Sequence, residues 1–206
     1  MNWYFWRFWV PLQLVTLATF IGIAMGYITV NPWNAFTSWF LIGVVGVGVG
    51  FHRLFSHRSF ETWKPVEYVI ATLGTLAAYC PVAFWTAIHQ QHHKVSDTEK
   101  DPSSPRQYGF WESFLWYRMR EDNLKKIHIK NYCFMRLAKD PYLMWLSKRF
   151  EVINWVVIGA VGLYSLDLMA SLLIVPIFIE HLRVNVISSL AHIKLPGSYR
   201  NHETGD

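Results

Sequence analysis

Five of the nine histidines fall into two compact clusters, and these residues are the ones best suited to carry chemistry. The first cluster is His52-Arg-Leu-Phe-Ser-His57 and the second is His89-Gln-Gln-His92-His93. Spacings of three and four residues place the rings of the second cluster on one helical face, where they can share metal ions. Neutral imidazoles suit iron, zinc, copper and nickel, and the lack of cysteine within the clusters argues against a thiolate zinc site.

The first cluster makes a demand on the helix that carries it. Five residues separate its two rings, which sets them about 140° apart on an ideal α-helix. We therefore expect the helix to end or distort between His52 and His57, so that both rings turn inward. The isolated histidines His128, His181 and His202 are interpreted as ordinary interfacial residues.

Composition indicates a membrane protein. Apolar residues make up 52% of the 206 residues and aromatic residues 17%, which exceeds the content of an ordinary soluble domain. No Asp, Glu, Lys or Arg occurs between Phe8 and His52, a stretch long enough to cross a hydrocarbon core of about 30 Å twice. Pro32 and Trp33 mark the break between the two crossings. The first apolar run is too long for a cleaved signal peptide and is interpreted as a retained anchor.

We expect an all-α integral membrane protein with one domain, residues 1–206, and four transmembrane helices in two hairpins. Residues 69–88 are apolar enough for a further crossing, but one crossing would place the two histidine clusters on opposite sides of the bilayer. An interfacial or re-entrant helix bent at Pro81 is therefore favoured. The predicted elements are spans at about 8–29, 34–51, 152–166 and 168–190, an interfacial helix at about 66–88, and a helical cap at about 89–150 that contains short helices at 112–120 and 141–150.

The distribution of charge indicates on which side of the membrane the predicted cap lies. Lys and Arg are concentrated in residues 116–150, and the positive-inside rule assigns that stretch to the cytoplasm. The chain shows no nucleic-acid reader motif, so the lipid bilayer with its anionic headgroups is the expected partner of the basic face, and nucleic acid is not. Cys80 and Cys133 lie far apart and indicate no disulfide framework.

Both clusters are worded as in the acyl desaturases of the stearoyl-CoA type, which this chain resembles. The resemblance runs through His52-Arg-Leu-Phe-Ser-His57-Arg58-Ser-Phe60 and Trp85-Thr-Ala-Ile-His89-Gln-Gln-His92-His93-Lys94, then through Asp97, Asp101-Pro102 and Gly109-Phe110-Trp111 to Ser189-Leu-Ala-His192. It implies four spans, cytoplasmic termini and a cytoplasmic cap that holds two iron ions. Carried over residue by residue, it implies six iron ligands: His52, His57, His89, His92, His93 and His192.

Two features depart from the family pattern. Four residues before the last ligand the family has an Asn that holds an iron-bound water, whereas this chain has Ser188. Asn185, on roughly the same helical face as His192, is the expected substitute. The family also carries a downstream HxxHH cluster, which this chain lacks before its last residue, Asp206. We therefore expect a truncated product or a fragment, or else a short natural protein that holds iron poorly or borrows ligands.

The resemblance implies an oxidoreductase of lipid metabolism that introduces a double bond, at position 9, into an acyl chain. An unactivated methylene requires an oxidant made from O₂ and a redox metal, because ordinary side chains cannot attack it. The implied partners are a fatty acyl-CoA or acyl-lipid substrate and an electron donor, either cytochrome b5 or a ferredoxin. A histidine-box hydroxylase and a non-catalytic desaturase-like membrane protein are the alternatives.

Several residues near the clusters have two interpretations. The carboxylates of Asp97, Glu99 and Asp101 are candidates to orient the imidazoles, or else belong to a solvated loop. Basic residues close to the clusters can hold the phosphates of an acyl-CoA or of a lipid headgroup, or simply contact anionic lipid: Arg53, Arg58, Lys94 and Arg106.

Overall fold

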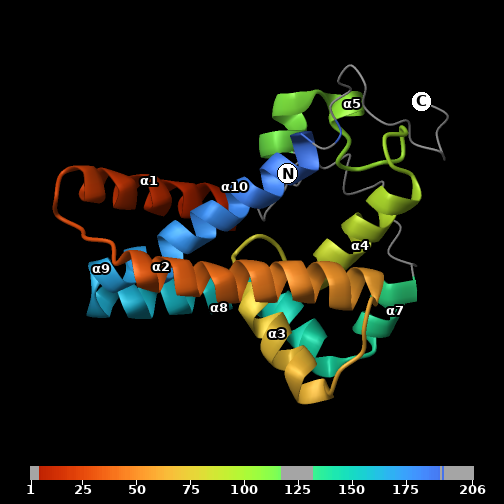
Figure 1. Cartoon of the computed structure of the whole chain (residues 1–206), viewed down its shortest axis with the longest axis horizontal. Coiled ribbons are helices and arrows are strands. Elements are labelled where there is room, and N and C mark those ends of the chain that lie inside the picture. Colours follow the sequence, from red (N-terminus) through yellow and green to blue (C-terminus); the bar gives the residue numbers. More distant parts are fainter. Residues whose placement is uncertain (1–4, 117–131, 191, 193–206) are drawn as a thin grey trace.

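Helices make up every regular element in residues 5–116, 132–190 and 192, the part of the chain that the computed structural model describes (Figure 1). Three of them are long and apolar enough to cross a membrane: Trp6–Ala24, Pro32–His57 and Leu166–Leu190. In chain order the elements are η1 (Phe5–Trp9), α1 (Val10–Ala24), α2 (Pro32–Trp39), η2 (Phe40–His57), α3 (Lys64–Leu76), α4 (Val82–Lys94), α5 (Pro105–Tyr108), η3 (Glu112–Trp116), α7 (Tyr132–Ala138), α8 (Pro141–Tyr164), α9 (Leu166–Met169), η5 (Ala170–Ile174) and α10 (Val175–Leu190).

The turns of the two helical hairpins meet at one end of the molecule, on the left in Figure 1. The Thr29 N–H donates to Oδ1 of Asp167 at 2.8 Å, and the Asn31 N–H donates to Oγ of Ser171 at 3.0 Å. Asn31 also caps α2, because its Oδ1 accepts from the N–H groups of Trp33 and Asn34. These bonds place the turn after α1 beside the turn after α8, far from both histidine clusters.

The second half of the chain corrects two predicted boundaries. The predicted short helix at 141–150 and the predicted span at 152–166 form one continuous helix, α8, which Asp140 caps. The predicted span at 34–51 continues to His57 as part of one helix formed by α2 and η2. The prediction treated charged and apolar segments as separate elements. A helix continues across such a change in composition as long as its backbone hydrogen bonds are satisfied.

The predicted interfacial helix at 66–88 is a helix–turn–helix. α3 ends at Leu76, Ala78 takes a left-handed φ of 52°, and Pro81 precedes α4. Because proline has no N–H and Ala78 leaves the helical region, a single helix cannot pass through this segment. α3 runs from the histidine end of η2 to the middle of η2, and α4 returns. Both histidine clusters therefore lie at the same end of the molecule, as predicted from their shared role.

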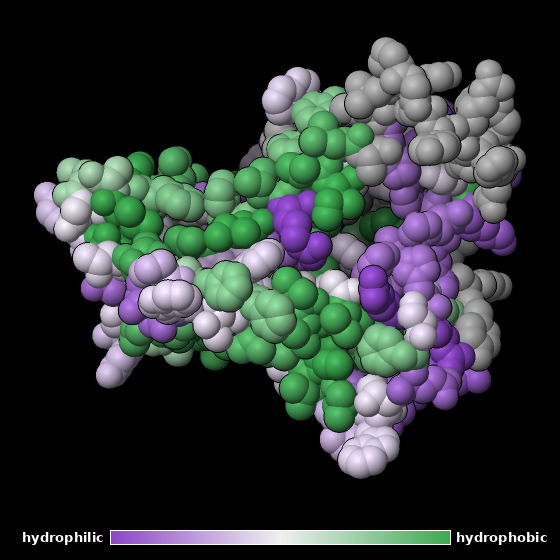
Figure 2. All heavy atoms as spheres, in the orientation of Figure 1, coloured by the Kyte–Doolittle hydropathy of each residue, from purple (hydrophilic) through white to green (hydrophobic). Residues whose placement is uncertain are grey.

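The cap at the histidine end is described only in part. Residues 117–131 lie outside the described residues, together with most of the predicted helix at 112–120, with His128 and with five of the basic residues. In Figure 2 hydrophobic atoms cover the face over α1, η2 and α3, whereas hydrophilic atoms gather where α4 and α7 lie. An ion-pair cluster ties this end together: Lys64 contacts Glu67 at 2.7 Å and Asp140 at 2.9 Å.

η2 and α3 approach so closely that two glycines face each other. A Cβ added at Gly46 would overlap the backbone of Gly74, and one added at Gly74 would overlap the ring of Phe51. The close approach lets α3 pack along η2 without displacing the helix end that carries the first cluster.

Replacing Gly46 with alanine should destabilise the protein by about 1–3 kcal/mol, because the backbone of Gly74 cannot move aside as a flexible side chain would. For a chain of this size the melting temperature should fall by roughly 2–4 °C for each kcal/mol. Thermal unfolding of the purified protein in detergent measures the change. Gly159→Ala is the control, since an added Cβ there meets no atom within 4 Å; equal melting temperatures for the two variants would contradict the packing argument.

Candidate metal centre

Four histidines from η2 and α4 gather their ring nitrogens within 4.8 Å of one another: His52, His57, His89 and His93. Nε2 of His89 lies at the middle of this group, 2.9 Å from Nε2 of His57 and 3.0 Å from Nε2 of His93. A neutral imidazole carries one N–H, which can donate to one acceptor only. Nε2 of His89 therefore cannot donate a hydrogen bond to both neighbouring nitrogens. Ring nitrogens gathered this closely are typical of a site that binds a metal ion.

The winding of η2 explains how both histidines of the first cluster face inward. The helix is π-helical from Phe40 to His57, with about 80° per residue instead of 100°, so five residues separate two rings by roughly 40°. The ring centroids of His52 and His57 are accordingly 4.7 Å apart. The helix ends there, because Arg58 takes a left-handed φ of 51°. The distortion predicted between the two histidines is thus spread over the whole element.

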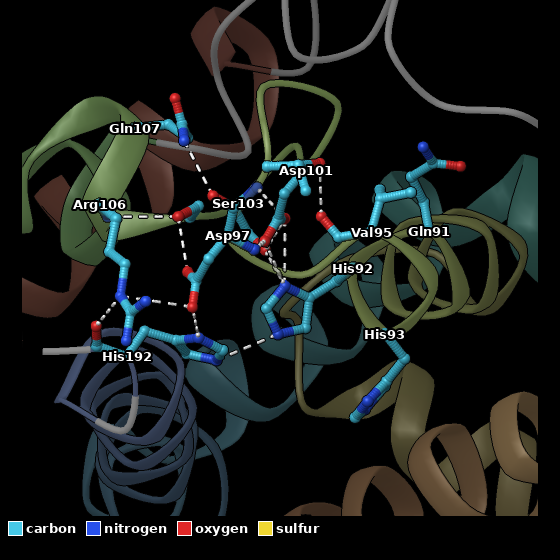
Figure 3. Close-up of polar contacts among 12 residues, drawn as sticks. Gln91, His92, His93, Val95, Asp97, Asp101, Ser103, Arg106, Gln107 and His192 are labelled. Atoms are coloured by element: carbon cyan, nitrogen blue, oxygen red, sulfur yellow. Dashed lines mark hydrogen bonds and ion pairs between the residues drawn. The ribbon is translucent and has the colours of Figure 1, made fainter. Parts of the chain in front are cut away.

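His92 and His192 form a second group beside the first (Figure 3). Their Nε2 atoms are 3.1 Å apart, and each Nδ1 faces a carboxylate: His92 lies 2.9 Å from Oδ2 of Asp101, and His192 lies 3.2 Å from Oδ2 of Asp97. A carboxylate accepts only, so the ring proton of each histidine is fixed at Nδ1. In the neutral, ligating form of both rings, the two Nε2 atoms then face each other as bare lone pairs.

The loop between α4 and α5 holds both carboxylates in place (Figure 3). Asp101 accepts from the N–H groups of Asp97 and Ser103, each at 2.9 Å, and Ser104 Oγ donates to Asp97 at 2.7 Å. Arg106 Nε donates to the backbone carbonyl of His192 at 3.2 Å, which connects the loop to the segment beyond α10. The loop therefore orients two histidines from separate parts of the chain, one on α4 and one beyond the end of α10.

Burial keeps the rings of His89 and His93 in the neutral, ligating form. Together with a smaller effect of the neighbouring histidines, it lowers the pKa of His89 to about 2 and that of His93 to about 4. Burial also opposes ionisation of Asp101, but the hydrogen bonds from His92 and from two backbone N–H groups outweigh it, so the pKa of this carboxyl lies below its usual value. Asp101 is therefore an acceptor and His92 a donor at Nδ1.

The arrangement fits metal ions. Nitrogen ligands about 2.1 Å from an ion and at right angles to one another lie roughly 3.0 Å apart, and three of the nitrogen pairs here are 2.9, 3.0 and 3.1 Å apart. Facing lone pairs repel unless a cation lies between them, and an all-imidazole set is one that iron accepts. The structure thus places all six histidines predicted as ligands at one site, in a group of four and a group of two.

Two neighbouring cavities, which share lining residues, border the histidines. One of about 210 Å³ is lined by five of the six, by the apolar side chains of Phe84 and Ile88, and by Ser188. A second, of about 190 Å³, lies between η2 and α10 and shares His52, His89 and Ser188 with the first. Trp85 lines both and stacks on His89 at an interplanar angle of 18°. The site can therefore receive an apolar chain next to the ring nitrogens.

Asn185, predicted to hold a metal-bound water, faces elsewhere. Its Oδ1 accepts from the hydroxyl of Tyr79 at 2.9 Å, and it lines a separate cavity together with His181 and Gln13. Asn185 precedes His192 by seven residues. On a helix this spacing gives nearly the same direction but a separation of about 10 Å, or two turns, along the axis. Ser188, one turn before His192, is the residue that lines the histidine cavities.

The remaining polar residues also fall into two groups, those that contact the proposed ligands and those that do not. His181, read as an ordinary residue, is buried and lies 3.2 Å from the carbonyl of Ala77. Of the three carboxylates considered, Asp97 and Asp101 orient histidines, and Glu99 is exposed. Ser103, whose hydroxyl contacts both His92 and Asp101, was missed. Its place two residues after an aspartate, where side chains bond the local backbone, is the signal that could have found it.

A helical chain with several apolar spans and six converging imidazoles defines a class of histidine-rich membrane proteins. Residues 31–205 match the family described as fatty acid desaturase. This match covers more than half of the chain, so the protein belongs to the fatty acid desaturase family.

Named relatives agree with the family. The chain is 34% identical over 147 residues to an sn-2 palmitoyl-lipid 9-desaturase of Nostoc sp. (strain 36), covering 66% of this chain and 50% of the relative. It is 38% identical over 114 residues to an sn-1 stearoyl-lipid 9-desaturase of Synechocystis sp. (strain ATCC 27184 / PCC 6803 / Kazusa), covering 55% of this chain and 35% of the relative. An sn-1 stearoyl-lipid 9-desaturase of Anabaena variabilis is 32% identical over 165 residues, 80% of this chain and 58% of the relative. The chain therefore spans about a third to three fifths of their lengths.

Replacing Asp101 with asparagine should weaken metal binding by about 10–100-fold, because the neutral amide no longer fixes the proton of His92 at Nδ1. Competition of the purified protein with a chelator for Fe²⁺ measures the affinity. Glu99→Gln is the control, since it removes an exposed carboxylate from the same loop. Equal affinities for wild type and Asp101→Asn would show that the carboxylate does not act on the ligand.

Proposed function

We propose that this protein is an O₂-dependent di-iron desaturase that introduces a double bond at position 9 of a fatty acyl chain. The observation that carries the proposal is the convergence of six imidazoles with the Nε2 atoms of His92 and His192 facing each other as lone pairs. Family membership supports the reaction class, and the names of the relatives support position 9.

The six histidines, His52, His57, His89, His92, His93 and His192, are proposed as the ligands of two iron ions. When bound, the irons would supply with O₂ the oxidant that removes two hydrogens from adjacent methylenes. The reaction consumes one O₂, two electrons and two protons, and it releases two waters. The protein's own part is to keep the imidazoles neutral through burial, to fix two tautomers through Asp97 and Asp101, and to hold the chain in the cavities beside His89.

The proposed topology has four spans in one domain: α1, α2 with η2, α8, and α9 with η5 and α10. It is supported by the bonds from Thr29 to Asp167 and from Asn31 to Ser171, which put both hairpin turns at one end. The histidine end would lie in the cytoplasm, because Lys and Arg are concentrated in residues 116–150 of the sequence, the predicted cap. From that side, cytochrome b5 or a ferredoxin would deliver the electrons.

Expression in a bacterium that makes only saturated chains tests the reaction. We expect new monounsaturated acyl chains with the double bond at position 9, detected by gas chromatography and mass spectrometry of the methyl esters, and about two irons per purified molecule. The variant His89→Ala, His92→Ala, His93→Ala should lose both the product and most of the iron, because it removes three of the six proposed ligands.

Other products would assign the site differently. A hydroxylated chain of unchanged saturation would replace desaturation with oxygen insertion by the same histidines. Iron-free protein that gives no product, although it is folded by its melting curve, would overturn the proposal in favour of a non-catalytic member of the family.

A further inference from the structure

A charged pair lies inside the last apolar helix, where charge is costly. Glu180 and Arg183 belong to the segment Leu166–Leu190, which is long and apolar enough to cross a membrane. They form a two-point ion pair, with Arg183 Nε 2.9 Å from Oε2 of Glu180 and Nη2 2.6 Å from Oε1. Ionisable residues in such a segment are rare and commonly have a function, and the proposed reaction leaves this pair without one.

Two glycines of η2 lie against the pair. The Glu180 carboxylate is fully buried and fills the space that a Cβ on Gly43 would take. The guanidinium of Arg183 passes Gly48, whose added Cβ would lie 4.0 Å from Nη2. Figure 2 shows hydrophilic atoms surrounded by hydrophobic ones on the face where α10 crosses η2. The ion pair therefore meets η2 at two positions that are five residues apart.

Both contacts require the π-helical winding of η2. At about 80° per residue, positions five apart differ in direction by roughly 40°, so Gly43 and Gly48 face α10 together. At the 100° of an α-helix they would point about 140° apart. With Gly48 kept in place, Val44 would then take the direction of Gly43 and bring an apolar side chain to a buried carboxylate. The ion pair thus fits the π-helical form of η2 and not the α-helical form.

The same winding brings the first histidine cluster together. His52 and His57 are also five residues apart, and their ring centroids lie 4.7 Å from each other. In a π-helix the N–H of residue i+5 bonds to the carbonyl of residue i, so a change to α-helical winding inside the element would leave a backbone group unpaired. The winding at Gly43 and Gly48 is therefore passed along η2, which is continuous from Phe40 to His57.

We propose that Glu180 and Arg183 are positioning residues, whose ion pair holds η2 in its π-helical winding and thereby keeps His52 and His57 on one face. The inference goes beyond the proposed function and rests on it only for the role of the two histidines as ligands. A buried ion pair is tolerated where the packing around it is closely matched. Only the π-helical form leaves the space beside Gly43 that the carboxylate fills, so the pair favours that form.

Disulfide cross-linking measures the winding without any metal. The variant His52→Cys, His57→Cys places two thiols five residues apart, which a π-helix brings to about one turn, roughly 5 Å, from each other. In an α-helix these positions are about 7.5 Å apart along the axis alone, beyond the limit of about 7 Å between the Cα atoms of a disulfide. We expect efficient cross-linking after mild oxidation, mapped by peptide mass spectrometry. Adding Glu180→Ala, Arg183→Ala should lower the cross-linked fraction at least fivefold.

A matched variant and a second cysteine pair control this result. Ile179→Ala, Leu182→Ala shortens two exposed side chains of the same helix and should leave the His52→Cys, His57→Cys cross-link unchanged. The pair His89→Cys, His93→Cys lies on α4, an α-helix with its own packing, and should cross-link equally with and without the ion pair.

Gly43→Ala tests the inference from the other helix. Its added Cβ would overlap the Glu180 carboxylate, so it should lower the His52→Cys, His57→Cys cross-link as the double alanine variant does, while a melting curve shows that the protein is folded. A missing cross-link in the chain with an intact ion pair, or equal cross-linking with and without the pair, would overturn the inference.

Competition with a chelator for Co²⁺ connects the winding to the ligands. With all histidines in place, Glu180→Ala, Arg183→Ala should bind Co²⁺ at least tenfold more weakly than Ile179→Ala, Leu182→Ala does, because His52 and His57 no longer share a face. Equal affinities would also overturn the inference. Neither measurement uses iron or turnover, so a protein that behaves as expected in both but makes no unsaturated product would contradict the proposed function alone.

Discussion

The contact between the Nε2 atoms of His92 and His192 is the constraint on which the rest of the site depends. Asp101 and Asp97 each face an Nδ1 atom, so that with both rings neutral the two ring protons lie on the far side and neither Nε2 can donate to the other at 3.1 Å. A metal ion bound to both lone pairs makes such a contact favourable. The need to bring this pair together explains why the loop after α4 folds back on itself and why Arg106 reaches the carbonyl of His192.

The first cluster solves a related problem by a change of helix geometry. An α-helix would send His52 and His57 to different faces, and a break would lose the rigidity that a ligand pair requires. π-helical winding keeps the element continuous and still turns both rings toward His89. π-helical segments occur frequently at functional sites, and here the cost is met by packing: Gly46 admits α3 and Gly43 admits Glu180, so the widened helix is held on two sides.

The features that depend on the local spacing of residues could be predicted from the sequence. The helical hairpins follow from the lack of charge between Phe8 and His52, and the shared side of the clusters follows from the need for one site. Asn185 shows where such reasoning ends: helical periodicity gives an angle but not a partner, and its partner Tyr79 is 106 residues away. The ion pair on α10 could not be predicted for the same reason. The space beside Gly43 that receives the Glu180 carboxylate forms only when η2 and α10 pack together.

The two halves of the site contribute different kinds of selectivity. An apolar cavity holds an acyl chain but cannot distinguish one methylene from the next, because each makes the same contacts. The position of a double bond therefore requires one polar contact at a fixed distance from the oxidising centre. Among the residues that line the cavity reaching His52 and His89, Arg183 is a polar group of this kind, held by its ion pair with Glu180.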